Sequence, residues 1–228
     1  MAAVNLRRIG LITFAAGVCA VAAIVLIRTM SAPATVDHRR ASQQVLYYTL
    51  SRVDDPIIVL GDSIVEASTL PRSACGHAVV NAGLNGASTA SDLGKWLAAV
   101  LESGRAAAII VALGTNDALM LSPSEQAFAE RYGALLGELS KLTTRLAILG
   151  IPSVEARERV TADMAKEIMA SVDKLNAVLP DIAKRANATF LPLPDMPSPH
   201  TIEGLHLNAA GYQVWDKAVM QGTALVCG

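Results

Sequence analysis

The sequence predicts an α/β fold in which one parallel sheet is covered by helices on both faces. Short apolar and β-branched runs alternate with longer segments whose apolar residues recur at helical spacing. Such alternation favours parallel strands joined by right-handed crossover helices. The expected strands cover residues 57–61, 78–82, 107–113, 145–150 and 188–192. The expected helices cover residues 89–103, 123–140, 158–178 and 209–222.

Local signals support each element. The run at residues 57–60 is wholly apolar and ends at Gly61, which is typical of a buried strand. The strongest strand signal is the run at residues 107–113, because it contains only Ala, Ile, Val and Leu. A short helix over residues 41–53 is expected before the first strand. The segment at residues 158–178 repeats apolar residues at helical spacing, as expected for a face packed on the sheet: Val160, Met164, Ile168, Val172 and Leu175.

Length and charge limit the classes of function. A chain of 228 residues with a net charge of -1 suits one domain with an accessory segment. The sequence has neither a basic run nor interleaved aromatic and basic residues. We therefore expect no nucleic-acid partner.

The accessory segment lies at the N-terminus. Residues 9–27 are apolar apart from one threonine, with arginines on both sides. A helix of this length spans about 28 Å, close to the ~30 Å hydrocarbon core of a bilayer. We therefore expect a membrane anchor within residues 1–30, a connector over residues 31–55 and a domain over residues 56–228. We expect that domain on the exported side, in the periplasm or outside the cell.

Two alternatives remain open for the N-terminal segment. One is a signal peptide, because residues 32–34 read Ala-Pro-Ala and resemble a cleavage site. Cleavage there would release a secreted protein. The other is a lipoprotein signal at Cys19, although the residue three positions earlier is Ala16 and not the usual leucine.

Four polar segments stand apart from this framework, at residues 61–63, 81–86, 114–117 and 203–206. A serine becomes a nucleophile when a histidine takes its proton and a carboxylate orients that histidine. Backbone N–H groups or a side-chain amide can stabilise the oxyanion that then develops. The segments supply these groups as Ser63, Gly86, Asn116, Glu203 and His206.

Each segment alone also has a structural interpretation. Asp62 and Ser63 are typical of a helix N-cap, and Gly86 is typical of a turn. Asn116 fits an Asx turn, and His206 fits a surface histidine at the start of the last helix. The combination of all four segments, in this order, favours the catalytic interpretation.

The four segments together resemble the SGNH (GDSL-type) hydrolases, which are named for Ser, Gly, Asn and His in four separated blocks. Those residues correspond here to Ser63, Gly86, Asn116 and His206. Gly86 is preferred to Gly83 because it lies five residues after Asn81, as in the family's Asn-x-x-x-x-Gly pattern. The resemblance spans nearly all of the chain that follows the N-terminal segment.

The resemblance implies a flavodoxin-like, three-layer α/β/α fold with a five-stranded parallel sheet. It implies that Ser63 is the nucleophile and His206 the base. The oxyanion hole would consist of the Ser63 and Gly86 backbone N–H groups and the Asn116 side chain. Neither a metal nor an organic cofactor is implied. Family members are esterases, lipases, thioesterases, carbohydrate O-acetylesterases and some acyltransferases.

Two positions depart from the family's usual pattern. Glu203 stands three residues before His206, where the family usually has aspartate. Its extra methylene changes the reach of the carboxylate, so Asp195 or a backbone carbonyl are alternative partners for the imidazole. Ala67 stands four residues after Ser63, where glycine is frequent. The Gly-x-Ser-x-Gly motif of α/β-hydrolases is absent around Ser63, which argues against that fold.

We expect a membrane-anchored serine esterase that removes a short acyl group from a cell-envelope glycan or a small ester. An acyltransferase, a lysophospholipase or a thioesterase would use the same residues. A catalytically inactive envelope-binding module is the alternative from another class, and Glu203 is the feature that favours it. Cys75 and Cys227 could form a disulfide in an exported domain or could both remain unpaired.

Overall fold

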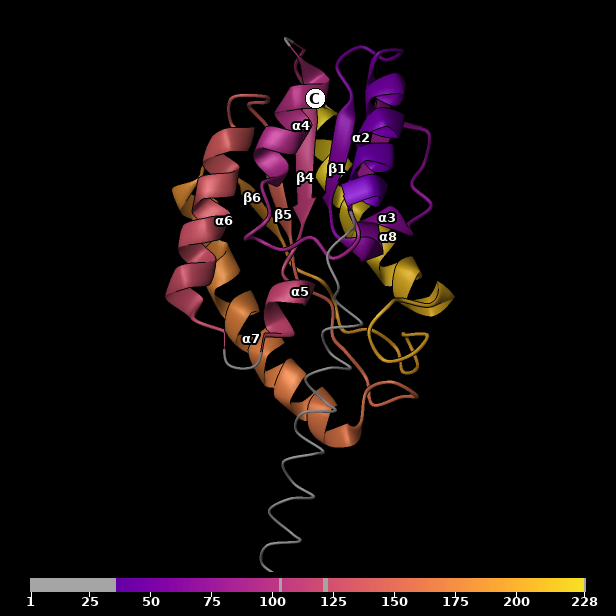
Figure 1. Ribbon diagram of the computed structural model, residues 1–228, viewed down its shortest axis with the longest axis vertical. Helices are drawn as coiled ribbons and strands as arrows, with labels where there is room; N and C mark the ends of the chain where they lie inside the picture. Colours follow the sequence, from indigo (N-terminus) through magenta and orange to yellow (C-terminus); the bar gives the residue numbers. More distant parts are fainter. Residues whose placement is uncertain (1–35, 103, 121–122, 228) are drawn as a thin grey trace, which may run out of the picture. The chain divides into compact units, whose positions relative to one another are not determined.

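Six strands form one sheet in the part of the chain that the computed structural model describes, residues 36–102, 104–120 and 123–227 (Figure 1). They are β1 (Ile57–Gly61), β2 (Ser73–Ala74), β3 (His77–Gly83), β4 (Ala108–Ala112), β5 (Leu146–Leu149) and β6 (Thr189–Leu191). The order across the sheet is β2-β3-β1-β4-β5-β6. All neighbours from β3 to β6 pair in parallel, which confirms the predicted parallel sheet and gives it the flavodoxin-like order.

The sheet has one strand more than the sequence predicts. Strand β2 pairs antiparallel with the start of β3, where Ser73 faces Ala78 and Ala74 faces His77. Two residues are too few to show an alternating apolar pattern, so this edge strand gives no sequence signal.

Helices cover both faces of the sheet, as predicted. On one face α4 (Leu93–Leu101), α6 (Glu125–Leu139) and α7 (Ala162–Arg185) lie side by side, and α2 (Val36–Leu50) packs on α4. On the other face α8 (Ala209–Thr223) packs on β4, β5 and β6 and continues into η1 (Ala224–Val226). Figure 1 shows α8 behind the sheet and α4 in front of it.

Helix α7 begins at Ala162 and not at the predicted residue 158, so Val160 precedes it. It also continues past the predicted end at residue 178, with Pro180 inside it. A proline disfavours a helix interior, which is why the sequence suggests an earlier end. Leu179, Ile182 and Ala183 are buried in this last part. Burial of that apolar face therefore outweighs the local cost of the proline.

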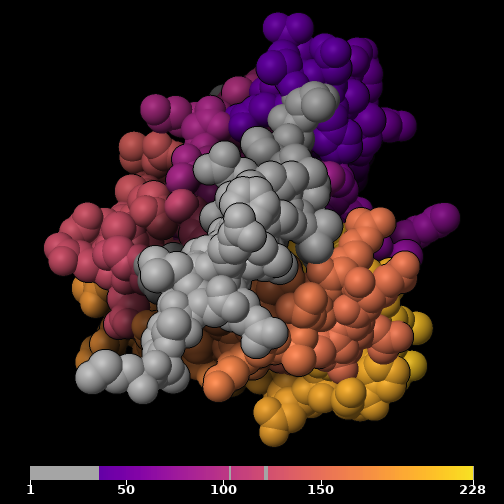
Figure 2. All heavy atoms as spheres, turned by 60° about the horizontal axis from the view of Figure 1, so that its bottom comes forward, coloured from indigo at the N-terminus to yellow at the C-terminus, as the bar shows by residue number. Residues whose placement is uncertain are grey.

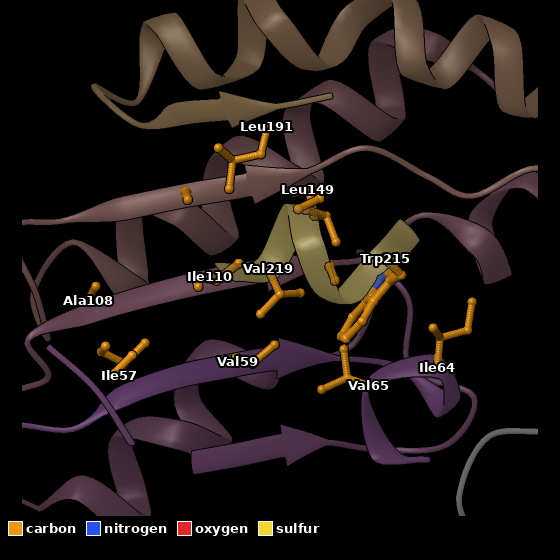
Figure 3. Packing of buried hydrophobic residues seen from close by; sticks show 14 of the residues in the cluster. Ile57, Val59, Ile64, Val65, Ala108, Ile110, Leu149, Leu191, Trp215 and Val219 are labelled. Atoms are coloured by element: carbon orange, nitrogen blue, oxygen red, sulfur yellow. The ribbon is translucent and has the colours of Figure 1, made fainter. Parts of the chain in front are cut away.

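The core between the sheet and α8 follows the two-residue period of the strands. Ile57 and Val59 of β1 and Ile110 of β4 point toward α8 (Figure 3). Trp215 and Val219 of α8 belong to the same buried cluster, and each is 1% exposed. Dense packing against the central strands fixes α8, and the catalytic candidate His206 lies three residues before that helix.

The segment predicted as a connector belongs, from Val36 on, to the same compact unit as the sheet. Leu46 and Leu50 of α2 are buried, and Arg39 forms an ion pair with Asp92. A disulfide joins Cys75, beside β2, to Cys227 at the end of η1. A cross-link over 152 residues stabilises a fold by about 2–5 kcal/mol.

The predicted membrane anchor at residues 9–27 and the alternative cleavage site both lie outside the described residues. Within the described residues, none of the helices is both long enough and apolar enough to cross a membrane.

Candidate active site

The four predicted segments meet at the edge of the sheet where the parallel strands end. Ser63 follows β1, Gly86 follows β3, and Asn116 lies on α5 (Thr115–Ala118) directly after β4. His206 lies between β6 and α8, in residues 198–208, which are here called the histidine loop. β1 lies between β3 and β4, where the strand order reverses, and open α/β sheets bind their ligands at such a point.

Ser63 is the first residue of a short helix, α3 (Ser63–Glu66). The Asp62 carboxylate caps this helix by accepting a hydrogen bond of 2.9 Å from the Ile64 N–H. The first N–H groups of a helix have no partner within the helix, so the Ser63 N–H is available to a ligand. The cap therefore presents the hydroxyl and the N–H of Ser63 at the carboxyl end of the central strand.

A serine, an imidazole and a carboxylate are in contact in series. Ser63 Oγ lies 3.0 Å from Nε2 of His206. The other ring nitrogen, Nδ1, contacts Oε1 of Glu203. The Glu203 side chain is 12% exposed and that of His206 33% exposed. Glu203, rather than Asp195, is thus the acid that contacts the imidazole.

The Asn116 side chain lies beside the loop that carries Gly86. Its Nδ2 donates a hydrogen bond of 2.8 Å to the Ala87 carbonyl. An amide nitrogen has two hydrogens, so one N–H remains for a ligand. Gly86 itself has a φ of +71°, a conformation that favours glycine. The structure therefore places the candidate oxyanion donors Gly86 and Asn116 on adjoining segments.

A buried carboxylate that sequence reasoning missed joins these two segments. Asp117 accepts hydrogen bonds from the Thr89 N–H at 3.0 Å and the Thr89 hydroxyl at 2.5 Å. Arg131 of α6 approaches the same carboxylate at 3.3 Å. The position of Asp117 directly after Asn116 was the only signal for this role. The network fixes the Gly86 loop relative to α5.

Gly83 has a structural role that differs from the role predicted for Gly86. A Cβ atom on Gly83 would lie 2.1 Å from the backbone N of Glu66. Gly83 therefore lets α3 approach β3 closely. The side-chain oxygen of Asn81 accepts a hydrogen bond of 2.9 Å from the Gly83 N–H. This geometry agrees with the preference for Gly86 as the site glycine.

Gly83→Ala is expected to destabilise the protein by about 3 kcal/mol, because helix backbone must move to admit the methyl group. Urea unfolding monitored by circular dichroism measures the change. Gly137→Ala is the matched control, since Gly137 is exposed on α6 with open space at its Cβ. The free energy of unfolding of the control should rise by up to about 1 kcal/mol, because alanine is favoured over glycine in a helix. Equal stabilities for the two variants would contradict this role.

Asp62, which directly precedes Ser63, is a buried acid. It is 1% exposed, and its Oδ2 has no hydrogen-bond partner among the described residues. Burial raises the pKa of Asp62 to about 7, and Asp117 adds to the rise, whereas the Ile64 N–H and His206 oppose it. Part of the Asp62 population is therefore protonated at neutral pH.

Asp62→Asn is expected to flatten the dependence of stability on pH. The folded-state pKa of about 7 exceeds the ordinary 3.8, so the contribution of Asp62 is complete below pH 3.8 and is lost as pH rises to about 7. Asparagine keeps the helix cap without titrating. Thermal unfolding from pH 4 to pH 8 should show a steeper fall for the wild type than for the variant. Parallel curves would contradict the assignment.

The fold and the contacts among Ser63, His206 and Glu203 define a class, the serine ester hydrolases with an α/β/α sheet. Comparison with known families then places the chain more narrowly. The sequence model of the GDSL-like lipase/acylhydrolase family matches residues 59–214. The chain belongs to this family, which confirms the resemblance seen in the sequence.

Several solved structures share the fold. A protein from Streptococcus pneumonia, proposed to be a platelet activating factor, is 25% identical with a TM-score of 0.69, covering 90% of this chain and 99% of its own. The aryl esterase of M. smegmatis is 15% identical with a TM-score of 0.58, and the match covers 73% of this chain and 97% of the esterase. An acetylxylan esterase from Geobacillus stearothermophilus, solved as a catalytic mutant, is 15% identical with a TM-score of 0.55, covering 74% and 94%. No curated protein matches the chain in sequence.

Proposed function

We propose that the protein hydrolyses a carboxylic ester through an acyl-enzyme on Ser63. The observation that carries the proposal is the contact of 3.0 Å between Ser63 Oγ and His206 Nε2, with Glu203 on the opposite ring nitrogen. The Glu203 carboxylate accepts a hydrogen bond from Nδ1–H of His206, which leaves Nε2 free to take the proton of the serine hydroxyl. This arrangement activates a nucleophile that is weak on its own.

The reaction then has two halves. In the first, Ser63 Oγ bonds to the ester carbonyl carbon, and the Ser63 and Gly86 N–H groups and the Asn116 amide stabilise the oxyanion. His206 passes the serine proton to the leaving alcohol as the C–O bond breaks. In the second, His206 takes a proton from water as the water oxygen attacks the acyl carbon. The bond from that carbon to Ser63 Oγ then breaks, His206 returns the proton to Oγ, and the carboxylic acid leaves.

A short acyl group on a cell-envelope glycan or on a small ester is the proposed substrate. The fold shared with an acetylxylan esterase is consistent with a short acyl group. We also propose that residues 9–27 anchor the protein in a membrane, with residues 56–228 on the exported side. The Cys75–Cys227 disulfide supports an exported location, because disulfides persist in oxidising compartments.

Assays of the purified full chain test the proposed activity. Nitrophenyl esters with acetyl, butyryl and longer acyl groups should show faster release for the short chains. Product analysis in the presence of sugar acceptors then separates hydrolysis from transfer, since only the acceptor differs. Faster turnover of lysophospholipids or thioesters would replace the proposed substrate, and an absence of turnover on all of them would contradict the activity.

Glu203→Gln is expected to lower kcat by up to about 10⁴-fold, because a neutral amide no longer stabilises the imidazolium that forms on His206. Steady-state rates on a short-chain ester measure the loss. Glu158→Gln makes the same change at an exposed position in a nearby loop and should retain the wild-type rate. An unchanged rate for Glu203→Gln would show that the enzyme does not depend on this acid.

A further inference from the structure

A second cluster of serine, histidine and glutamate lies beside the catalytic candidates. Ser153 Oγ is 3.0 Å from Nε2 of His200, and Nδ1 of the same ring is 3.2 Å from Oε1 of Glu155. His200 is 5% exposed. The 3.2 Å contact is close enough for an ion pair, but its angles are not those of a hydrogen bond. These residues take no part in the reaction described above.

The geometry around His200 does not suit a second nucleophile. Its Nε2 also lies 3.1 Å from the carbonyl oxygen of Ser153. A carbonyl oxygen can only accept, so this contact favours the tautomer in which Nε2 carries the proton and donates it. A ring nitrogen that already holds a proton cannot take one from the Ser153 hydroxyl. The cluster therefore connects two loops rather than activating a serine.

Glu155 is the centre of that connection. Its carboxylate accepts four hydrogen bonds from one short segment: Ser198 Oγ at 2.8 Å, His200 N at 2.9 Å, Thr201 N at 2.9 Å and Thr201 Oγ1 at 2.7 Å. Burial acts to raise the pKa of Glu155, but the bonds from Thr201, Ser198 and His200 outweigh it and lower the pKa to about 2. The group is thus a carboxylate at every pH relevant to an assay.

The side chain of Glu155 binds residues 198–201, which form the first arm of the histidine loop. Thr201 pairs with Leu207 across the loop, and Ile202 N donates to His206 O at 2.8 Å. The first arm therefore sets the position of the returning arm, on which the catalytic candidate His206 lies.

The tip of the histidine loop, at Glu203 and Gly204, forms hydrogen bonds with the segment that carries Glu155. Glu155 N donates to Gly204 O at 3.0 Å, and Arg159 N donates to Glu203 O at 3.2 Å. A Cβ atom on Gly204 would lie 2.6 Å from Val160, so the contact is close. In Figure 2 the orange surface around residues 150–165 adjoins the golden surface of the histidine loop.

We propose that Glu155 is a positioning residue, which holds the histidine loop so that Glu203 and His206 align with Ser63. The proposal rests on the proposed function. Glu155 acts on the first arm through its carboxylate and on the tip through its backbone N–H. A displacement of about 1 Å in a reacting group can cost about 10²-fold in rate, so loss of this carboxylate affects kcat more than substrate binding.

The test compares Glu155→Gln, Glu155→Asp and the control Glu158→Gln in the full chain on a short-chain nitrophenyl ester. Glu155→Gln places an amide against four donors and should lower kcat by about 10–100-fold with KM within twofold. Glu155→Asp keeps the charge and should recover part of the rate. The control should match the wild type. A kcat for Glu155→Gln within twofold of the wild type would overturn the proposal.

A second measurement does not depend on activity. Hydrogen–deuterium exchange followed by mass spectrometry should show faster exchange of residues 198–206 in Glu155→Gln, with β1 unchanged. Unchanged exchange in residues 198–206 would overturn the positioning role. Thr201→Val removes one hydroxyl donor at nearly constant shape and should give a smaller effect of the same kind, even where Glu155→Gln does not fold. A wild-type protein that is folded but inactive would instead contradict the proposed function.

Discussion

Ser63→Ala is expected to abolish measurable ester hydrolysis, with a fall in kcat on the order of 10⁶-fold. Without Oγ no acyl-enzyme can form, and the remaining oxyanion donors can only assist direct attack by water. KM should change little, because a serine hydroxyl contributes little to binding of the ground state. The fold should be unaffected, since the cap of α3 depends on the Asp62 carboxylate and not on Ser63.

Steady-state kinetics on a short-chain ester measure this loss, with circular dichroism to verify folding. Ser51→Ala provides a matched control, because Ser51 is an exposed serine that follows α2. It should keep the wild-type rate. A Ser63→Ala enzyme that retains even a tenth of the wild-type kcat would contradict the role of Ser63.

His206→Ala is expected to lower kcat about as far as Ser63→Ala. The serine hydroxyl, 3.0 Å from Nε2, then has no base to take its proton. Residues that act as a unit are not additive, so the double variant Ser63→Ala with His206→Ala should be no slower than either single variant. Additive losses would show that the two residues act independently.

His77→Ala is the control for the histidine substitution. His77 opens β3, at the end of the sheet opposite Ser63. Its ring contacts the Asp55 carbonyl at 2.7 Å. This variant should retain the wild-type kcat, and a loss comparable to that of His206→Ala would mean that the assay reports general damage.

The sheet was predictable because burial on both faces leaves a simple signal. Continuous apolar runs identify β1 and β4, and the observed bounds agree within a residue or two. Strand β2 and the last turns of α7 were not predictable. β2 is too short for a pattern, and α7 continues past Pro180 because distant residues bury its apolar face.

The candidate site was predictable where its residues fall in short motifs. Ser63 and Asn116 each follow a strand, and His206 precedes the last helix, all in recognisable neighbourhoods. The contact between Glu203 and His206 follows from their close spacing. Contacts between distant segments that lie outside these motifs were not predictable.

Two networks illustrate this limit. Asp117 meets Thr89 and Arg131, and Glu155 meets the segment after residue 197. No local pattern links these partners, because the fold alone brings them together. Sequence reasoning therefore identifies the candidate reacting groups and misses the residues that hold them in place.

Covalent labelling with a fluorophosphonate is the most direct test of the central claim that Ser63 is an activated nucleophile. In that reaction the serine oxygen displaces fluoride from phosphorus, and the general base takes the serine proton. Intact protein followed by peptide mass spectrometry should show one phosphonyl group on the peptide that contains Ser63. Ser63→Ala should remain unlabelled, and His206→Ala should label far more slowly. A folded wild-type protein that is not labelled, or a label that persists in Ser63→Ala, would contradict the account.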